Sequence, residues 1–403
     1  MEKTLKYNAG QPLWFWGADR NDKTHLRIKL ELVHEVDGTD LTEAWRKTLK
    51  VYPLLNWIPE DVNGDILYYE PEKEPQPVHC DAPVMPYTEL AGKRVIAVSY
   101  YDKSVTVTLF HAISDATGII GVLKTLMYHY CTLHFHKEYD QAGIMLTEGR
   151  EVEEYYGSPF RLPLGDYTSQ PLAFFPIGNT VYRDPDMVPP NPGDIVTSCV
   201  TVSSEEFMRY CKEHKANPSA MLCILLGKAV YSMHPEERRR LCLDVTVDYR
   251  KALGLTECLG VFSSAAIICT TYEQIMEGSI EDNAAAIREA LNKQRTEDYA
   301  KTKMDMARTY VILNESSAAI SYEGTIDFGS CNDHVTGIFL ANNTCNTIHM
   351  VEFKGDFILH FQHGKATEAN KNAFVAQLKK AGISIKAESG TFTIPPEITE
   401  IKE

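Results

Sequence analysis

The sequence predicts a two-domain α/β protein with mixed sheets. In both halves of the chain, short runs of alternating or β-branched apolar residues are followed by longer segments with apolar residues at helical spacing, as in strands that alternate with helices. Between the halves, residues 176–192 contain five prolines, which disfavour helix and central strand alike. We therefore expect an N-terminal half over residues 1–175, a linker over 176–194, and a C-terminal half over 195–403 with a segment that crosses back to the first half.

The composition is that of an ordinary folded protein. Of its 403 residues, 44% are hydrophobic and 24% are charged, close to the globular average. With 40 Lys and Arg against 55 Asp and Glu, the net charge is −15, which argues against a nucleic-acid partner because phosphate contacts need a basic surface. The first 17 residues lack the apolar core of a signal peptide, and no apolar run reaches about 20 residues. We expect a cytoplasmic protein without a membrane span.

The ten cysteines are spread singly along the chain, without C-x-x-C pairs. Several lie inside apolar runs, where a buried thiol is the usual state. This pattern predicts reduced cysteines and agrees with a reducing compartment.

The N-terminal half begins with a strand and a helix. Apolar residues recur at every second position over residues 25–32, which is typical of a half-buried strand. Residues 37–40 have the composition of a turn and an N-cap, and the apolar spacing over residues 41–51 then predicts an amphipathic helix that ends near Pro53.

A predicted hairpin leads into a long helix. Residues 94–100 and 104–110 are two strand-like runs separated by a three-residue turn. His111 falls where the second run ends, and helical spacing continues from Asp115 to about Phe135. His111 is therefore expected on a strand-to-helix turn.

The C-terminal half repeats the alternation of strands and helices. The expected strands are residues 195–202, 242–247, 264–271 and 357–362. The expected helices are residues 204–214, with Ser203 or Ser204 as the N-cap, and residues 218–231, 283–294 and 366–381.

Residues 109–118 contain a candidate catalytic group. His111 at a strand end is followed four residues later by Asp115 at a helix start. Taken alone, this spacing fits a structural role, because Asp is a preferred N-cap. The segment also resembles the H-x-x-x-D-G motif of the chloramphenicol-acetyltransferase-like superfamily of acyltransferases, which includes nonribosomal-peptide condensation domains and alcohol acetyltransferases.

Three further segments extend this resemblance in chain order. Residues 41–54 look like an early helix that closes on an h-P-x-L element, and residues 247–250, Val-Asp-Tyr-Arg, look like the V-D-x-R segment. Residues 321–329 end on Asp-Phe-Gly and are similar to the late D-F-G element. The likeness covers residues 25–365, and the chain is most similar to bacterial alcohol acetyltransferase-like proteins.

The resemblance implies a chloramphenicol-acetyltransferase-like fold with an active-site tunnel between the two domains. His111 would be the general base of an acyl transfer, a role that suits neutral imidazole at physiological pH. Asp115 would form a salt bridge with Arg250 and fix the loop of His111. Possible tunnel-lining residues are Ser263, Ser264, Asp327, Phe328 and Gly329.

The resemblance also implies the substrates. An acyl-CoA, most simply acetyl-CoA, would be a co-substrate rather than a bound cofactor, and the acceptor would be a small molecule with a hydroxyl or an amine. A free-standing condensation domain that uses carrier-protein thioesters is an alternative, which the net charge disfavours because carriers are acidic and only scattered basic residues such as Arg238 to Arg240 are present. The other alternative is a non-catalytic binding protein of this fold. Ala116 favours it, because a Cβ restricts a backbone that the motif Gly can hold at positive φ.

No metal site is expected. His129, His134 and His136 lie close in sequence, but their spacings of five and two residues do not place all three on one helical face.

Overall fold

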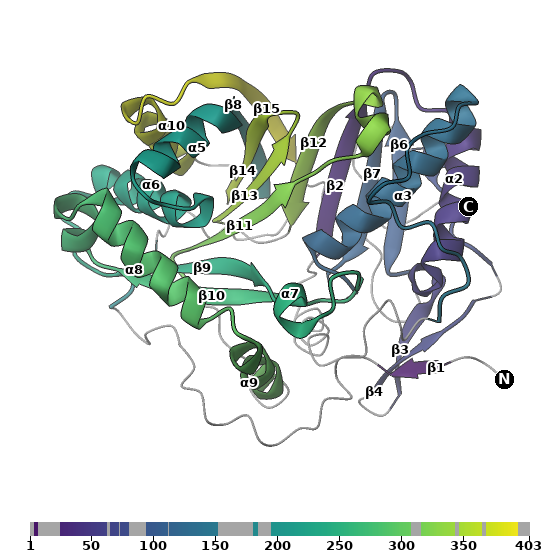
Figure 1. Cartoon of the computed structure of the whole chain (residues 1–403), viewed down its shortest axis with the longest axis horizontal. Coiled ribbons are helices and arrows are strands. Elements are labelled where there is room, and N and C mark those ends of the chain that lie inside the picture. The colour runs from purple at the N-terminus through teal and green to yellow at the C-terminus, as the bar shows by residue number, and fades with distance from the viewer. Residues whose placement is uncertain are drawn as a thin grey trace.

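The computed structural model describes residues 4–6, 25–62, 65–71, 73–79, 94–111, 113–151, 180–183, 195–307, 316–342, 346–364 and 368–393. Over these residues the chain forms two half-molecules that lie side by side, each with a sheet and helices packed against it (Figure 1). Both sheets contain parallel and antiparallel pairs, so the predicted α/β class with mixed sheets is confirmed.

The N-terminal half is built on a five-stranded sheet with the order β12-β2-β7-β6-β5. Its strands are β2 (His25–Leu32), β5 (Val78–His79), β6 (Ile96–Tyr101), β7 (Ser104–Phe110) and β12 (Val335–Asn342). The strand β12 comes from late in the chain and pairs with β2, so it ties the second half of the chain to the first sheet.

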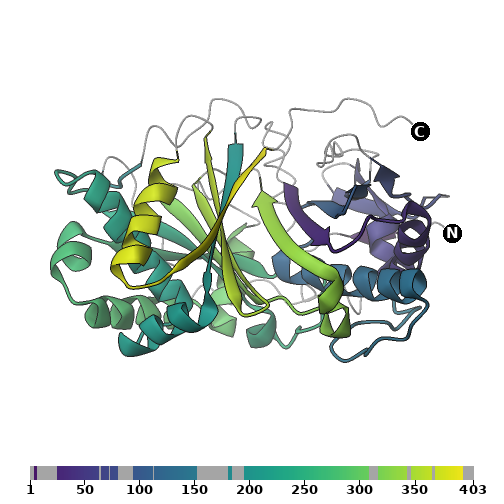
Figure 2. The ribbon, with the colours of Figure 1, turned by 90° about the horizontal axis from the view of Figure 1, so that it is seen from above.

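Two helices, α2 (Gly38–Val51) and α3 (Ala116–Phe135), pack together against this sheet (Figures 1 and 2). The carboxylate of Asp37 caps α2 by accepting from the backbone N–H groups of Thr39 and Asp40. The helix ends just before Pro53, as its sequence predicts.

The C-terminal half is built on a seven-stranded sheet with the order β10-β9-β11-β13-β14-β8-β15. Its strands are β8 (Ile195–Ser203), β9 (Leu241–Asp248), β10 (Ser263–Thr270), β11 (Ala318–Thr325), β13 (Thr347–Phe353), β14 (Asp356–Gly364) and β15 (Ile385–Thr393). The helices that share one apolar core with it include α5 (Ser204–Glu213), α6 (Pro218–Met233), α8 (Ile280–Lys293) and α10 (Ala369–Lys380), and α9 (Glu297–Ala307) adds Tyr299 and Ala300 to this core.

This sheet forks between β9 and β11. The parallel pairing of the two strands covers only residues 243–245 of β9 and 318–320 of β11. Beyond these residues β11 stays paired with β13, whereas β9 stays paired with β10, and the two pairs diverge (Figure 1). Past the branch point β9 and β11 are therefore no longer hydrogen-bonded to each other.

The remaining elements are short. A three-stranded sheet has the order β1-β4-β3 and consists of β1 (Thr4–Lys6), β3 (Ile58–Val62) and β4 (Asp65–Tyr69). The other helical segments are η1 (Pro53–Asn56), α7 (Arg250–Leu253), η5 (Glu273–Glu277), α9 (Glu297–Ala307) and η6 (Gly329–His334). None of the helices in the described ranges is long and apolar enough to cross a membrane.

Each strand and helix predicted above is present with its ends shifted by a few residues at most. The strands β1, β3, β4, β5, β11, β12, β13 and β15 and the helices α7 and α9 were not predicted. Of the predicted linker, only residues 180–183 lie within the described part of the chain. There Val181 forms a bridge with Arg240, and Tyr182 is buried in the C-terminal core.

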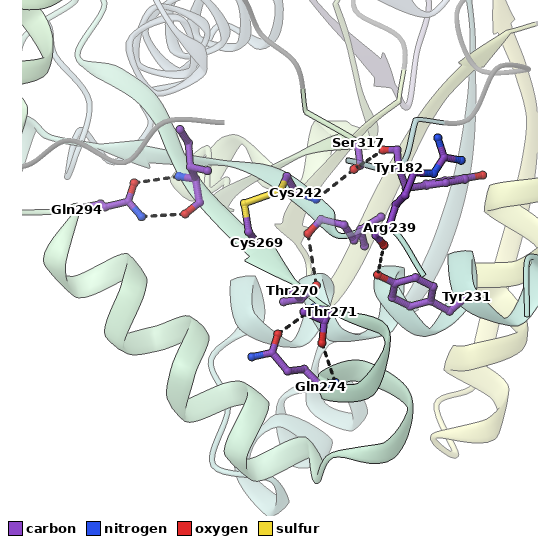
Figure 3. The surroundings of a disulfide bond; sticks show 12 residues. Tyr182, Tyr231, Arg239, Cys242, Cys269, Thr270, Thr271, Gln274, Gln294 and Ser317 are labelled. Carbon is purple, nitrogen blue, oxygen red and sulfur yellow. Dashed lines mark hydrogen bonds between the residues drawn. A yellow bond between two sulfur atoms is a disulfide. The ribbon is translucent and has the colours of Figure 1, made fainter. Parts of the chain in front are cut away.

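One prediction about the cysteines is wrong. Cys242 on β9 and Cys269 on β10 are direct partners in the antiparallel register and form a disulfide (Figure 3). Spacing along the chain could not reveal this pair, because it depends on the register of two strands 27 residues apart. The six other cysteines in the described ranges are buried thiols, as predicted.

Candidate active site

His111 follows the fully buried strand β7 and lies on the turn before α3. Its side chain reaches the cavity described below. Burial lowers the pKa of His111 below its ordinary value, and the negative charges of Asp115 and Glu323 offset this shift only in part. The imidazole is therefore neutral at physiological pH and able to accept a proton.

Asp115 is the N-cap of α3 and is completely surrounded by donors. One carboxylate oxygen accepts from the backbone N–H of Gly118 at 3.1 Å, and the other accepts from those of Phe262 and Ser263 at 2.9 and 3.0 Å. The guanidinium of Arg250 donates to both oxygens, at 2.7 and 2.9 Å. Burial alone would raise the pKa of Asp115, but Arg250 and the backbone N–H groups lower it below its usual range.

Arg250 is held just as firmly as Asp115. Its Nε donates to the carbonyl of Cys258 at 2.8 Å, and its Nη2 donates to that of Gly260 at 2.6 Å. Its Nη1 also reaches Asp248 at 3.2 Å. The Asp115–Arg250 pair thus fixes the turn of His111, which belongs to the N-terminal half, to the β9–β10 connection of the C-terminal half.

The structure does not support the argument from Ala116, which stands where the family motif has Gly, for a non-catalytic protein. This residue begins α3 and does not have a positive φ. The position that requires glycine is Gly118, where a Cβ would lie 2.1 Å from Ser114 Oγ and 2.3 Å from the carbonyl oxygen of Leu259. Glycine is needed here for close approach of the two halves, so Ala116 is no argument for a non-catalytic protein.

His111 opens onto a cavity of about 420 Å³. Its described lining comes from the start of α3, from both arms of the sheet fork (β9–β10 and β11–β13), and from the ends of β2 and β12. The titratable residues in that lining are His111, Asp115, Asp244, Asp248, Tyr322, Glu323 and His349. The cavity therefore lies between the two halves, with His111 on one wall and the fork of the sheet on the other.

Neither a scan against protein-family models nor a search of curated protein sequences finds a match. Solved structures do match over nearly the whole chain. TRI101 of F. sporotrichioides, solved with coenzyme A and T-2, is 13% identical, with 95% of this chain and 99% of that chain covered and a TM-score of 0.66. Polyketide synthase associated protein 5 of Mycobacterium tuberculosis is 12% identical, with 93% and 96% covered and a TM-score of 0.64. The condensation domain of the Monacolin K polyketide synthase MokA is 11% identical, with 94% and 96% covered and a TM-score of 0.62.

The chain has the chloramphenicol-acetyltransferase-like fold of condensation domains. The fold implied by the sequence resemblance is thus confirmed.

Within this chloramphenicol-acetyltransferase-like fold, two of the recognised motif segments meet at the cavity. Residues 109–118 supply His111 and Asp115, and residues 247–250 supply Asp248 and Arg250. Ser263 and Ser264, at the start of β10, lie in the lining, and Ser263 also donates its backbone N–H to Asp115.

The D-F-G element lies elsewhere. Asp327 is exposed and accepts from the backbone N–H of Gly329 at 2.8 Å, while Phe328 is buried in the N-terminal core. None of the three belongs to the described lining of the cavity. These residues form the turn that starts η6, where the positive φ of Gly329 is needed, so we withdraw them as tunnel-lining residues.

Sequence reasoning missed most of the lining, including the titratable residues Glu323 and His349. Glu323 is on β11 and His349 is on β13, and their side chains lie 3.4 Å apart. The other ring nitrogen of His349 is 3.1 Å from the amide nitrogen of Asn342, at the end of β12. Alternation of Ile348 and Met350 with polar neighbours is the one sequence signal that could have located this strand.

The described residues hold no cluster of His, Cys, Asp and Glu that could bind a metal ion. His134 instead contacts Asp40 at 2.9 Å, and His136 is the left-handed C-cap of α3. Both histidines therefore have local contacts that explain their presence.

Proposed function

We propose that this protein is an acyltransferase that moves an acyl group from a CoA thioester to a hydroxyl or amine acceptor, with His111 as the general base. The observation that supports this most is the position of His111. A neutral imidazole faces a cavity between the two halves, and the turn that bears it is fixed by the Asp115–Arg250 pair.

The reaction follows from this arrangement. The acceptor oxygen or nitrogen attacks the thioester carbonyl carbon, and His111 takes the proton that the acceptor loses. The tetrahedral intermediate then expels the CoA thiolate, which receives the proton from the His111 imidazolium. Asp115 holds the turn of His111 in place and takes no part in the proton transfer, since all the close partners of its carboxylate are Arg250 and backbone N–H groups. The group that stabilises the oxyanion stays unassigned.

Two observations favour CoA, most simply acetyl-CoA, over a carrier-protein donor. A structure with the same fold, TRI101, was solved with coenzyme A. The basic residues 238–240, which could bind an acidic carrier protein, precede β9 at the end opposite Asp248. At the usual rise of a strand they lie about 25 Å from Asp248, which lines the cavity. Arg239 there is already paired with Glu237. The carrier-dependent alternative rests on the condensation domain of MokA, which has the same fold.

Cytoplasmic location stays a prediction. In a reducing compartment Cys242 and Cys269 would be held as two thiols.

Thermal-shift measurements with CoA, acetyl-CoA and an acylated carrier domain test the donor. A ligand that binds only the folded state at 100 times its Kd adds about 2.7 kcal/mol to the free energy of unfolding, which is easily seen as a raised midpoint. We expect acetyl-CoA to raise the midpoint and to release free thiol when an acceptor is supplied. A midpoint raised by the acylated carrier domain alone would overturn the CoA proposal in favour of the condensation-type alternative.

A further inference from the structure

The disulfide between Cys242 and Cys269 belongs to the β9–β10 arm of the forked sheet (Figure 3). Side chains at every second position of a strand share one face, so Cys242 lies on the same face of β9 as Asp244, Thr246 and Asp248. These three residues line the cavity that contains His111. The disulfide therefore continues the row of side chains that forms this wall of the cavity.

The two cysteines differ in their access to solvent. Cys242 is fully buried and packs with Val181 and Ile267. Cys269 is exposed, and it lies on β10, which is an edge strand of the seven-stranded sheet. A dissolved thiol or disulfide can therefore approach Cys269, whereas Cys242 is shielded and exchanges through its partner.

Backbone contacts keep the two cysteines opposite each other without the sulfur–sulfur bond. The antiparallel register of β9 and β10 runs without a shift over the whole of β10. On the outer edge of β10, the side-chain amide of Gln294 accepts from the backbone N–H of Ile267 and donates to its carbonyl, both at 2.9 Å. Because these contacts hold the two strands in register after reduction, the same two sulfur atoms can bond again.

Cys242 also lies where β9 meets the start of β11. Its backbone N–H donates to Ser317 Oγ at 3.1 Å, and its carbonyl accepts from the backbone N–H of Ser317 at 2.7 Å. Ser317, which immediately precedes β11, also donates its hydroxyl to the carbonyl of Tyr182 at 2.6 Å (Figure 3). The disulfide thus connects the edge strand β10 covalently to the branch point of the fork.

We propose that Cys242 and Cys269 form a reversible thiol–disulfide switch that sets the rigidity of the β9–β10 wall of the cavity. In the dithiol state hydrogen bonds alone join the two strands, and an edge strand held in this way opens locally more readily. In the disulfide state a covalent bond joins them. The same wall supplies the backbone N–H of Ser263 to Asp115, so its mobility bears on the turn of His111. The switch does not depend on the acyl transfer proposed above.

A small disulfide such as oxidised glutathione closes the bond. The thiolate of Cys269 attacks one sulfur of oxidised glutathione, whose sulfur–sulfur bond breaks and releases one glutathione thiolate. The thiolate of Cys242 then attacks the Cys269 sulfur of this mixed disulfide and displaces the second glutathione thiolate. The two protons lost by the cysteines go to the two glutathione thiolates, so two protein thiols are oxidised while one glutathione disulfide is reduced. Excess reduced glutathione reverses both steps.

Equilibration of the full chain in glutathione buffers tests the switch. Free thiols are alkylated, and peptide mapping shows whether Cys242 and Cys269 carry the label. We expect neither to be labelled in excess oxidised glutathione, both to be labelled in excess reduced glutathione, and the first state to return when the oxidant is restored. Hydrogen exchange of the backbone amides of β10 should be at least about threefold faster in the reduced state, whereas that of β13 and β14 should not change.

Two variants provide the controls. Cys269→Ser removes the exposed partner and should show the faster exchange of β10 in both buffers. Cys211→Ala removes a buried thiol on α5 and should keep the full response of the wild-type chain. A bond that never forms, a bond that survives excess reduced glutathione, or equal exchange of β10 in the two states would each overturn the switch. The wild-type comparison holds even if a variant fails to fold, and none of these measurements requires turnover.

Discussion

Replacing Asp115 with Ala should lower the free energy of unfolding by about 3–5 kcal/mol, because it leaves the Arg250 guanidinium buried without its partner. The side chains of both residues are only 3% exposed, so water cannot take over the lost contact. Arg250→Ala should cost a similar amount for the same reason. Urea unfolding of both variants measures this.

The double variant distinguishes coupling from two separate defects. Asp115→Ala with Arg250→Ala should cost less than the sum of the single changes, by roughly 1–3 kcal/mol, because neither charge is then left alone. Glu289→Ala, which removes an exposed ion pair with Lys293, is the control and should have little effect. Strictly additive losses would show that Asp115 and Arg250 stabilise the fold independently.

His111→Ala should reduce acyl transfer by about 10²–10⁴-fold while leaving the fold intact. The residue lies on a turn beside a cavity, so truncation removes the proton acceptor without opening a packed core. Thiol release from acetyl-CoA and the thermal midpoint should be recorded on the same preparation.

His134→Ala provides the matched control for this change. His134 contacts Asp40, lies outside the described cavity lining, and should leave turnover unchanged. Unchanged turnover in His111→Ala would contradict its assignment as the base, and a collapsed thermal midpoint would return it to a structural role.

The local elements of this fold were predictable because their apolar spacing is simple. The alternation in β2 and the apolar residues along α3 bury one face of each element, and that periodicity is visible in the sequence. The end of α2 at Pro53 and the N-cap of α3 at Asp115 follow from rules of the same local kind.

The wall opposite His111 was not predictable in this way. Strands β11 and β13 place Ser321, Glu323 and His349 into a polar cavity, and these residues interrupt the apolar pattern by which strands are recognised. The contact between Asp115 and Arg250 spans 135 residues, and only the family resemblance suggested it. The fork and the strand order depend on tertiary pairing, which leaves no local signal.

The pH dependence of kcat/KM for acyl transfer tests the central claim most directly. Because burial lowers the pKa of His111, the wild-type rate should stay constant around neutrality and fall in acid with an inflexion below pH 6.5, where the imidazole becomes protonated and can no longer accept a proton. The residual activity of His111→Ala should lack this inflexion. An inflexion that persists unchanged in His111→Ala would contradict the account and assign the base to another group.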